Sequence, residues 1–236
     1  MALTQKLLLQ LRARGTSMLY QDLLYFLQNV GKDPSRLIFE DELTGIYNRR
    51  FLLNYFEYKI PWDFLENHPV SLIMLDIDYF KQINDTHGHA AGDQALIWLG
   101  TLLRKVTGES GLPIRYAGDE FVILLPKAEK QTALQIGERI IELVHEKPVP
   151  LQGTEDEFPL TLSIGIASAP EDATTGKDLI QKADTALYFS KKTGRDRLTN
   201  ASLVTPHEVF DKTALYQGGK GLFCQRLHEA LPDWRW

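Results

Sequence analysis

Two pairs of acidic residues have the types and spacing to do chemistry. Asp76 and Asp78 follow the apolar run 70–75, and Asp119 and Glu120 lie between two other apolar runs. Asp76 and Asp78 are two positions apart, so on a strand they point to the same face. Such close carboxylates repel each other unless a cation lies between them, and Mg²⁺ prefers oxygen ligands of this kind. The alternative for the pair alone is a solvated strand end.

Asp119 and Glu120 are expected at the tip of a β-hairpin. Strands are predicted over 113–116 and 121–125, and the four residues between them have turn chemistry. If this hairpin lies beside the strand that leads to Asp76, then Asp76 and Asp119 can share a metal ion. Acids in turns are also common on ordinary surfaces, so this pair alone does not decide between the two interpretations.

Three cations could complete a site of this kind. Lys81 lies five residues after Asp76, and Lys191 and Arg195 lie on or just after the helix predicted over 176–190. Cations beside a carboxylate–metal site indicate a polyphosphate ligand, because they offset the phosphate charge. A lone lysine is usually a solvated surface charge, so it is the conjunction of groups that favours a site.

The elements that must position these groups alternate between strand and helix. Strands are predicted over 70–75, 113–116, 121–125 and 160–167, and helices over 48–58, 79–86, 93–106, 129–146 and 176–190. A turn is expected over 41–45, and a Gly-rich turn over 87–92 separates the second and third helices. The order predicts an α/β (α+β) sandwich, in which helices cover a mixed central β-sheet.

The two ends of the chain differ from this central part. Residues 17–30 have apolar side chains at helical spacing, which predicts either a packing helix or a dimer contact. A turn over 216–221 and a short amphipathic helix over 222–231 are expected near the other end. We therefore divide the chain into an N-terminal helical segment (1–37), a central domain (38–200) and a C-terminal extension (201–236), the last expected to begin a truncated further domain.

The composition limits the classes of function. The chain has 236 residues, 44% of them hydrophobic, and a net charge of -5, which is ordinary for a soluble globular protein. The negative charge argues against nucleic-acid binding but not against a small phosphorylated ligand. Cys224 is the only cysteine, so an intrachain disulfide and a Cys-based zinc site are excluded, and a cytoplasmic location fits best. No apolar stretch is long enough for a membrane span.

An ordered series of motifs gives the chain a specific resemblance. The motifs are Asp41-Glu42-Leu43-Thr44, Asn48-Arg49-Arg50, the run Leu75–Asp85, Gly88-His89, Gly92-Asp93, the run Arg115–Phe121, Ser163-Ile164-Gly165 and Ala183-Asp184 through Tyr188. Together they closely resemble the GGDEF domain of diguanylate cyclases. The resemblance implies a fold like that of nucleotide cyclases and polymerase palms. It also implies condensation of two GTP into cyclic di-GMP, with release of two pyrophosphates, at the interface of two domains in a homodimer.

The same resemblance implies roles for individual residues. Asp76, Asp119 and the Ile77 carbonyl would bind magnesium (Mg²⁺) or manganese (Mn²⁺), and Glu120 would be a further acid that helps to hold it. Asp119 would also accept the proton of the attacking hydroxyl, and Lys81 would stabilise the transition state. The substrate contacts implied are the phosphate-binding groups Phe80 (through its backbone), Lys81, Lys191 and Arg195, the base-binding pair Asn84 and Asp93, and His89.

Two departures from the family pattern bear on activity and control. Ala117 replaces the first glycine of the name-giving motif, which costs little if its backbone φ is negative. Many relatives carry an inhibitory Arg-x-x-Asp motif that binds cyclic di-GMP, and its two key positions fall here on Gly108 and Gly111. Neither glycine can supply a guanidinium or a carboxylate. We therefore expect no product inhibition through that motif.

Three alternatives to an active diguanylate cyclase remain. A catalytically silent GTP-binding module would signal through a partner, but the intact Asp76, Lys81 and Asp119 argue against it. An enzyme that makes a mixed guanine–adenine dinucleotide is disfavoured by Asp93, whose carboxylate can accept both hydrogen bonds from guanine. A relationship to nucleic-acid polymerases is expected at the level of the fold only.

Overall fold

The computed structural model describes residues 34–204, apart from residues 61, 63–64, 66–67, 152 and 154. The helices predicted over 17–30 and 222–231, and the turn over 216–221, lie outside the described residues. Within the described part of the chain, no helix is both long and apolar enough to span a bilayer.

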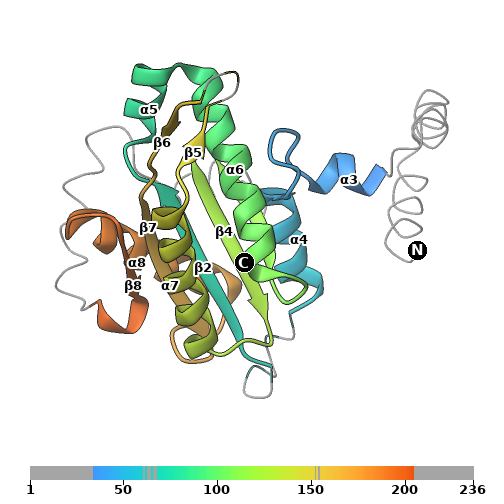
Figure 1. The fold of residues 1–236 in the computed structure, drawn as a ribbon. Coiled ribbons are helices and arrows are strands. Elements are labelled where there is room, and N and C mark those ends of the chain that lie inside the picture. Colours follow the sequence, from blue (N-terminus) through green and yellow to red (C-terminus); the bar gives the residue numbers. More distant parts are fainter. Residues whose placement is uncertain are drawn as a thin grey trace, which may run out of the picture.

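A mixed sheet forms the centre of the fold (Figure 1), as the sequence predicts, and it has six strands where four were expected. Its strand order is β1-β3-β4-β2-β7-β8, with parallel pairing between β1 and β3 and between β7 and β8. A separate two-stranded ribbon is formed by β5 and β6. The strands are β1 (Tyr47–Asn48), β2 (Val70–Ile77), β3 (Leu112–Ala117), β4 (Glu120–Pro126), β5 (Val149–Pro150), β6 (Glu157–Phe158), β7 (Leu162–Ala169) and β8 (Arg197–Asn200).

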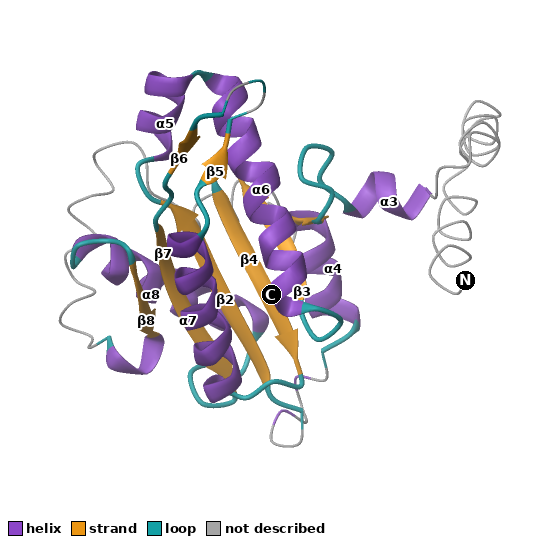
Figure 2. Cartoon of the chain, in the orientation of Figure 1, coloured by secondary structure: helices purple, strands orange, loops and turns teal. Residues whose placement is uncertain are grey.

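Helices cover both faces of this sheet (Figure 2). Side chains of α6 and α7 pack in one hydrophobic core, and those of α4 and α8 pack in the core on the opposite face. The short helix α5 lies at one end of the sheet (Figure 1). The helices are α3 (Pro34–Phe39), α4 (Arg49–Tyr58), α5 (Phe80–His87), α6 (His89–Thr107), α7 (Lys130–Glu146) and α8 (Gly176–Lys192).

Strand β2 is buried along its whole length. Leu72 and Met74 belong to the core that contains α4 and α8, whereas Ile73 and Leu75 belong to the other core. Burial on both faces explains why the strand is a continuous apolar run rather than an alternating one. Because the side chains alternate, Asp76 falls on the face that α8 covers.

The prediction of a Gly-rich turn over 87–92 and a helix from Asp93 is wrong. Helix α6 begins at His89, and Gly88, with φ of 86°, alone separates it from α5. Gly92 lies inside α6, where a Cβ atom would come within 2.0 Å of the Asn84 Oδ1 atom. Glycine at position 92 therefore allows α5 and α6 to pack closely and does not form a turn.

The β3–β4 hairpin is tighter than predicted. Ala117 pairs with Glu120, so the turn consists of Gly118 and Asp119 alone. Gly118 has φ of 52°, whereas Ala117 is not among the described residues with positive φ. Alanine in place of the family's first glycine therefore introduces no backbone strain, as expected from the sequence.

Gly165 in β7 lets α8 approach the sheet. A Cβ atom at this position would lie 2.2 Å from both the carbonyl oxygen of Ala183 and the backbone nitrogen of Leu187. No side chain fits in that space, so glycine is required for this packing. The close contact fixes how α8 lies on the sheet and brings its last turn, with Lys191, toward the end of β2.

Candidate functional site

The two acidic pairs meet at one end of the sheet, which the sequence left open and which Asp76 and Asp119 need in order to share a metal ion. In the β2–β4 register Asp76 lies opposite Glu120. The backbone N–H of Ile77 donates to the carbonyl oxygen of Asp119 at 3.4 Å. The hairpin turn therefore lies directly beside the end of β2, and the negative charges of Asp119 and Asp78 both act on Asp76.

Asp76 is a buried carboxylate held by one cation. Only 8% of its surface is exposed, and its Oδ2 atom lies 2.6 Å from the Lys191 Nζ atom. Burial, with a smaller contribution from the charges of Asp119 and Asp78, raises the pKa of Asp76 to about 6 despite the opposing effect of Lys191. The fold therefore keeps Asp76 in an environment where a second cation would be favourable.

This raised pKa predicts an unusual dependence of stability on pH. The pKa of this carboxyl is about 6 in the folded protein and near 3.8 in the unfolded chain, so the folded protein binds the proton more tightly. Its contribution to the free energy of unfolding is therefore full below about pH 4 and is lost as the pH rises through the folded pKa. Asp76→Asn cannot ionise, so we expect it to raise the free energy of unfolding by roughly 1–3 kcal/mol near neutral pH.

Urea unfolding in buffer without divalent cations measures this effect. The Asp76→Asn variant and the unmutated protein should differ little below about pH 4 and diverge as the pH rises. If the variant is the less stable protein at neutral pH, the ion pair with Lys191 outweighs the burial of Asp76, and the prediction is wrong.

Asp78 has a structural environment that differs from that of Asp76. Its side chain accepts hydrogen bonds from the hydroxyl groups of Thr161 (3.0 Å) and Ser163 (2.7 Å) and from the backbone N–H of Asp196 (3.0 Å). Ser163 lies opposite Asp76 in the β2–β7 register, which puts both acids on one face, as their spacing predicts. Protein donors satisfy Asp78, so a cation shared with Asp76 is not needed.

The residues expected to contact phosphate surround the N-terminus of α5. Phe80 and Lys81 are the first two residues of this helix, and Tyr79 precedes them without capping the helix through its side chain. The first N–H groups of a helix have no partner within it and suit an anion. Lys81 is exposed, while Arg195 comes from the loop between α8 and β8 and reaches Tyr79.

The expected base-binding residues lie on α5 and α6. Asn84 packs against Gly92, and Gly92 directly precedes Asp93, so the two packed helices bring Asn84 and Asp93 close together. Asp93 is exposed, and so is His89 at the start of α6. Because Asp93 is a helical residue rather than the first residue after a turn, α6 fixes its position more firmly than the sequence prediction implied.

The donor set at the end of β2 fits a hard divalent cation. Asp76, Asp119 and the Ile77 carbonyl offer oxygen ligands, which Mg²⁺ and Mn²⁺ prefer. Within the described residues no three or more His, Cys, Asp or Glu side chains are grouped so that they could hold a metal ion. In that part of the chain the expected set of Asp76, Asp119 and Glu120 with the Ile77 carbonyl is therefore not found as a group of three carboxylates, which leaves Asp76, Asp119 and the carbonyl as the ligands considered. A cation there must compete with Lys191 for Asp76.

Two supporting residues of the hairpin were not assigned a role from the sequence. Arg115 donates through Nε to the carbonyl oxygen of Gly118 at 2.9 Å and through Nη1 to Asp41 Oδ1 at 3.1 Å. Asp41 also accepts from the backbone N–H and the hydroxyl group of Thr44, and these bonds hold its pKa below the usual value despite burial. Through Arg115, the turn that contains Asp41 therefore helps to hold the hairpin turn that contains Asp119.

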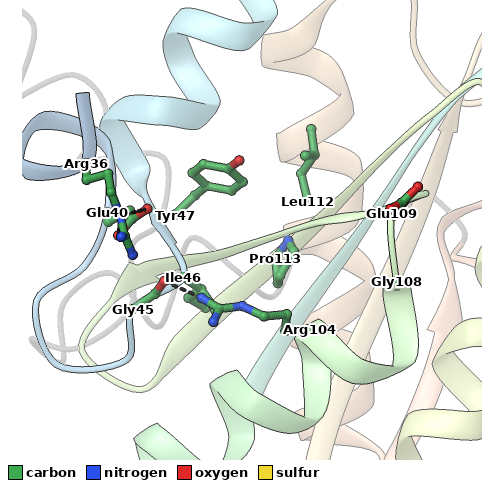
Figure 3. Close-up of a pocket in the computed structure, with 11 residues that line it drawn as sticks. Arg36, Glu40, Gly45, Ile46, Tyr47, Arg104, Gly108, Glu109, Leu112 and Pro113 are labelled. Atoms are coloured by element: carbon green, nitrogen blue, oxygen red, sulfur yellow. Dashed lines mark hydrogen bonds and ion pairs between the residues drawn. The ribbon is translucent and has the colours of Figure 1, made fainter. Parts of the chain in front are cut away.

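A pocket of about 480 Å³, drawn in Figure 3, is lined by none of the acids at the end of β2. It includes Gly108 and Gly111, the two positions of the missing Arg-x-x-Asp motif, and the side chains of Arg36 and Arg104. Both arginines already have partners, because Arg36 pairs with Glu40 at 2.9 Å and Arg104 donates to the carbonyl oxygen of Gly45. The pocket therefore lacks the pair of groups through which such motifs bind the cyclic dinucleotide.

The mixed sheet and its helical layers define an α/β domain of the nucleotide-cyclase palm type, with carboxylates and cations gathered at one end of the central strand. The sequence profile of the family described as "Diguanylate cyclase, GGDEF domain" matches residues 38–197. The chain therefore belongs to the GGDEF-domain family of diguanylate cyclases.

Curated relatives have closely similar sequences in this region. "Response regulator PleD" of Caulobacter vibrioides is 34% identical over 171 residues, which cover 72% of this chain and 38% of PleD. "Diguanylate cyclase A" of Treponema denticola is 39% identical over 130 residues, which cover 55% of this chain and 34% of the relative. The matched region is thus little more than a third of each relative.

Solved structures show the same fold. The GGDEF domain of DgcB from Caulobacter crescentus, in complex with c-di-GMP, has a TM-score of 0.64 at 29% identity, covering 69% of this chain and 95% of that one. The diguanylate cyclase SiaD of Pseudomonas aeruginosa, in complex with its activator SiaC, has a TM-score of 0.63 at 32% identity, covering 84% and 76%.

Proposed function

We propose that this chain condenses two molecules of GTP into cyclic di-GMP and releases two pyrophosphates. The observation that carries the proposal is the convergence of Asp76 and Asp119 at the end of β2, beside Lys191 and the N-terminus of α5. This set of oxygen ligands, cations and helix N–H groups suits phosphoryl transfer. Membership of the diguanylate cyclase family supports the same reaction.

In this reaction the 3′-hydroxyl of each GTP attacks the α-phosphorus of the other. Asp119, at the hairpin turn, accepts the hydroxyl proton, and Lys81 stabilises the charge that develops on the phosphoryl oxygens. Lys191, Arg195 and the N–H groups at Phe80 bind the phosphates. Mg²⁺ or Mn²⁺ held by Asp76, the Ile77 carbonyl and Asp119, with Glu120 as a further acid, would neutralise charge on the phosphates.

Guanine binds between α5 and α6 in this proposal. Asp93 accepts from the N1–H and N2–H₂ groups of guanine, and the Asn84 side chain, held against Gly92, offers a second polar contact. Adenine has no matching pair of donors, so it would leave the carboxylate unpaired. His89, exposed at the start of α6, contacts the substrate from the same side.

Incubation with GTP and Mg²⁺, followed by nucleotide chromatography, tests the proposed function. We expect cyclic di-GMP and pyrophosphate in a molar ratio of one to two. GTP binding without product would favour the alternative of a silent GTP-binding module, whereas conversion of a GTP–ATP mixture to a mixed dinucleotide would favour the second alternative.

The reaction needs two domains face to face, because each binds one GTP. Specific activity should therefore rise with protein concentration in the dilute range, as expected for a transient homodimer. Deletion of residues 1–33 leaves α3 intact and should move this rise to higher concentration, if the N-terminal segment assists pairing. Activity assays over a dilution series measure both curves.

A flat profile for the full chain would indicate a tight dimer instead of a transient one. Identical curves for the full and shortened chains would show that the N-terminal segment does not assist pairing.

We also expect no product inhibition at the pocket that contains Gly108 and Gly111. Neither glycine has a side chain that can bind a guanine edge or a phosphate, and Arg36 and Arg104 are already engaged. Calorimetry with cyclic di-GMP, with a GTP analogue in the active site, should detect no tight binding. Micromolar binding that also slows turnover would contradict this prediction.

The wider setting of the chain follows as part of the proposal. The enzyme acts in the cytoplasm, where GTP is available, and binds no nucleic acid.

A further inference from the structure

The loop between α8 and β8 has an unusual backbone. Three consecutive residues have positive φ: Gly194 (123°), Arg195 (61°) and Asp196 (47°). Residues with a Cβ atom rarely adopt this conformation, and they keep it only where the surrounding structure enforces it. Something must therefore hold Arg195 and Asp196 in this conformation.

Asp78 holds the backbone of this loop. Its side chain is completely buried, and its Oδ2 atom accepts the backbone N–H of Asp196 at 3.0 Å. The same carboxylate is fixed by the hydroxyl groups of Thr161, which precedes β7, and of Ser163 in β7. The backbone N–H of Arg195 also donates to the carbonyl oxygen of Ser190, at 2.9 Å. The position of the Arg195 Cα atom is thus set from two sides.

The side chain of Arg195 contacts Tyr79, and its Nε atom also lies 4.0 Å from Asp78 Oδ1. The guanidinium carbon lies 4.6 Å from the centre of the Tyr79 ring, and Nη1 lies 3.4 Å from the Tyr79 hydroxyl oxygen. Tyr79 itself is 53% exposed and has φ of 56°. Neither its exposure nor its backbone conformation is explained by packing in the core, so the ring has another purpose.

The position of the stacked Tyr79 and Arg195 side chains in the fold indicates what the Tyr79 ring does. Tyr79 lies between Asp78 and Phe80, directly before the N-terminus of α5, where the phosphates bind in the proposed function. An exposed arginine otherwise samples many rotamers, and a cation stacked on an aromatic ring is held in place. Stacking uses the face of the guanidinium and leaves donors at its edge for phosphate oxygens.

We propose that Tyr79 is a positioning residue, which holds the Arg195 guanidinium beside the N-terminus of α5 for the phosphates of bound GTP. This inference rests on the proposed function of the site. Because the contact of Nη1 with the Tyr79 hydroxyl is long, at 3.4 Å, the proposal predicts that the aromatic ring, and not the hydroxyl group, raises affinity for phosphate-bearing guanine nucleotides, and that it does so only through Arg195.

Three variants test the proposal. Tyr79→Asn removes the ring but keeps a residue that tolerates positive φ, Tyr79→Phe keeps the ring, and Arg195→Ala removes the cation. Calorimetry with GDP measures binding without turnover, and guanosine serves as the ligand without phosphates. We expect Tyr79→Asn to weaken GDP binding about 3- to 10-fold, to leave guanosine unchanged and to raise the KM for GTP more than it lowers kcat. Tyr79→Phe should bind GDP like the unmutated protein.

The double variant decides whether Tyr79 acts through Arg195. In the Arg195→Ala background, Tyr79→Asn should weaken GDP binding less than about 2-fold. An equal loss in both backgrounds, or GDP binding unchanged in Tyr79→Asn, would overturn the proposal. Unchanged GDP binding in Arg195→Ala would overturn it too, while product formation from GTP would still support the proposed function. If the proposed cyclase function is wrong, the unmutated protein will form no cyclic di-GMP from GTP.

Discussion

Replacement of Asp119 by asparagine should abolish turnover, with a fall in kcat of about 10³-fold or more. Asparagine keeps the size of the side chain but removes the negative charge and the proton acceptor. Asp119 lies in the two-residue turn directly beside the end of β2, where the proposed function needs both a metal ligand and a proton acceptor. The rate of cyclic di-GMP formation, followed by chromatography, measures the loss.

The control for this prediction separates chemistry from folding and binding. Glu129→Gln makes the same change of charge at an exposed acid before α7, and its turnover should match the unmutated protein. Affinity of Asp119→Asn for GTP should fall far less than its rate, because Asn84 and Asp93 remain. Cyclisation by this variant at a near-normal rate would show that Asp119 is neither a required ligand nor the proton acceptor.

Asp93→Ser should relax the choice of base. In the unmutated protein the two hydrogen bonds from guanine should favour GTP over ATP by about 2–4 kcal/mol, which is roughly 30- to 1000-fold in kcat/KM. Serine cannot accept both bonds, so the preference should fall by at least 10-fold. Competition between GTP and ATP, with each product resolved by chromatography, gives the ratio directly.

A matched variant on another helix controls for general damage. Glu138→Ser replaces an exposed acid of α7 and should leave the GTP preference unchanged. Equal use of ATP and GTP by the unmutated protein would refute the role of Asp93. If Asp93→Ser keeps the unmutated protein's preference for GTP over ATP, then groups other than Asp93 recognise the base.

Much of the fold was predictable because its signals are local. The apolar run of β2, the hairpin before and after Gly118 and the helical spacing along α7 and α8 each follow from side-chain periodicity or turn chemistry. Whether Asp76 and Asp119 come together was left open by the sequence, and the β2–β4 register shows that they do.

The features that sequence reasoning missed depend on contacts between distant segments. In the sequence Gly92 is typical of a turn, yet it lies within α6. Glycine is needed there because Asn84 occupies the space that a side chain would fill. The short strands β1 and β8 have too few residues to show a period, and parallel partners define them. Likewise Lys191 was expected beside phosphate, and only the packing of α8 on β7 shows that it pairs with Asp76.

Other errors and gaps have a similar cause. Asp78 was interpreted together with Asp76, because nothing near it in the sequence reveals the hydroxyl groups of Thr161 and Ser163. Arg115 and Asp41 are far apart in the chain, so their ion pair at 3.1 Å was not foreseen. The only signal in the sequence is that Arg115, in the predicted hairpin, needs an acidic partner, and Asp41 is one of the acids that could be that partner.

The place of β2 in the sheet has a consequence for how the protein folds. Both of its hydrogen-bonded neighbours, β4 and β7, are distant in the sequence, and neither is joined to it by a short loop. Long loops must therefore close before the central strand gains its partners, which slows folding relative to a chain rich in local pairings. The acidic cluster forms only when these strands come together. Its mutual repulsion therefore opposes assembly of the sheet, and a divalent cation bound at the cluster would add to the stability of the folded protein.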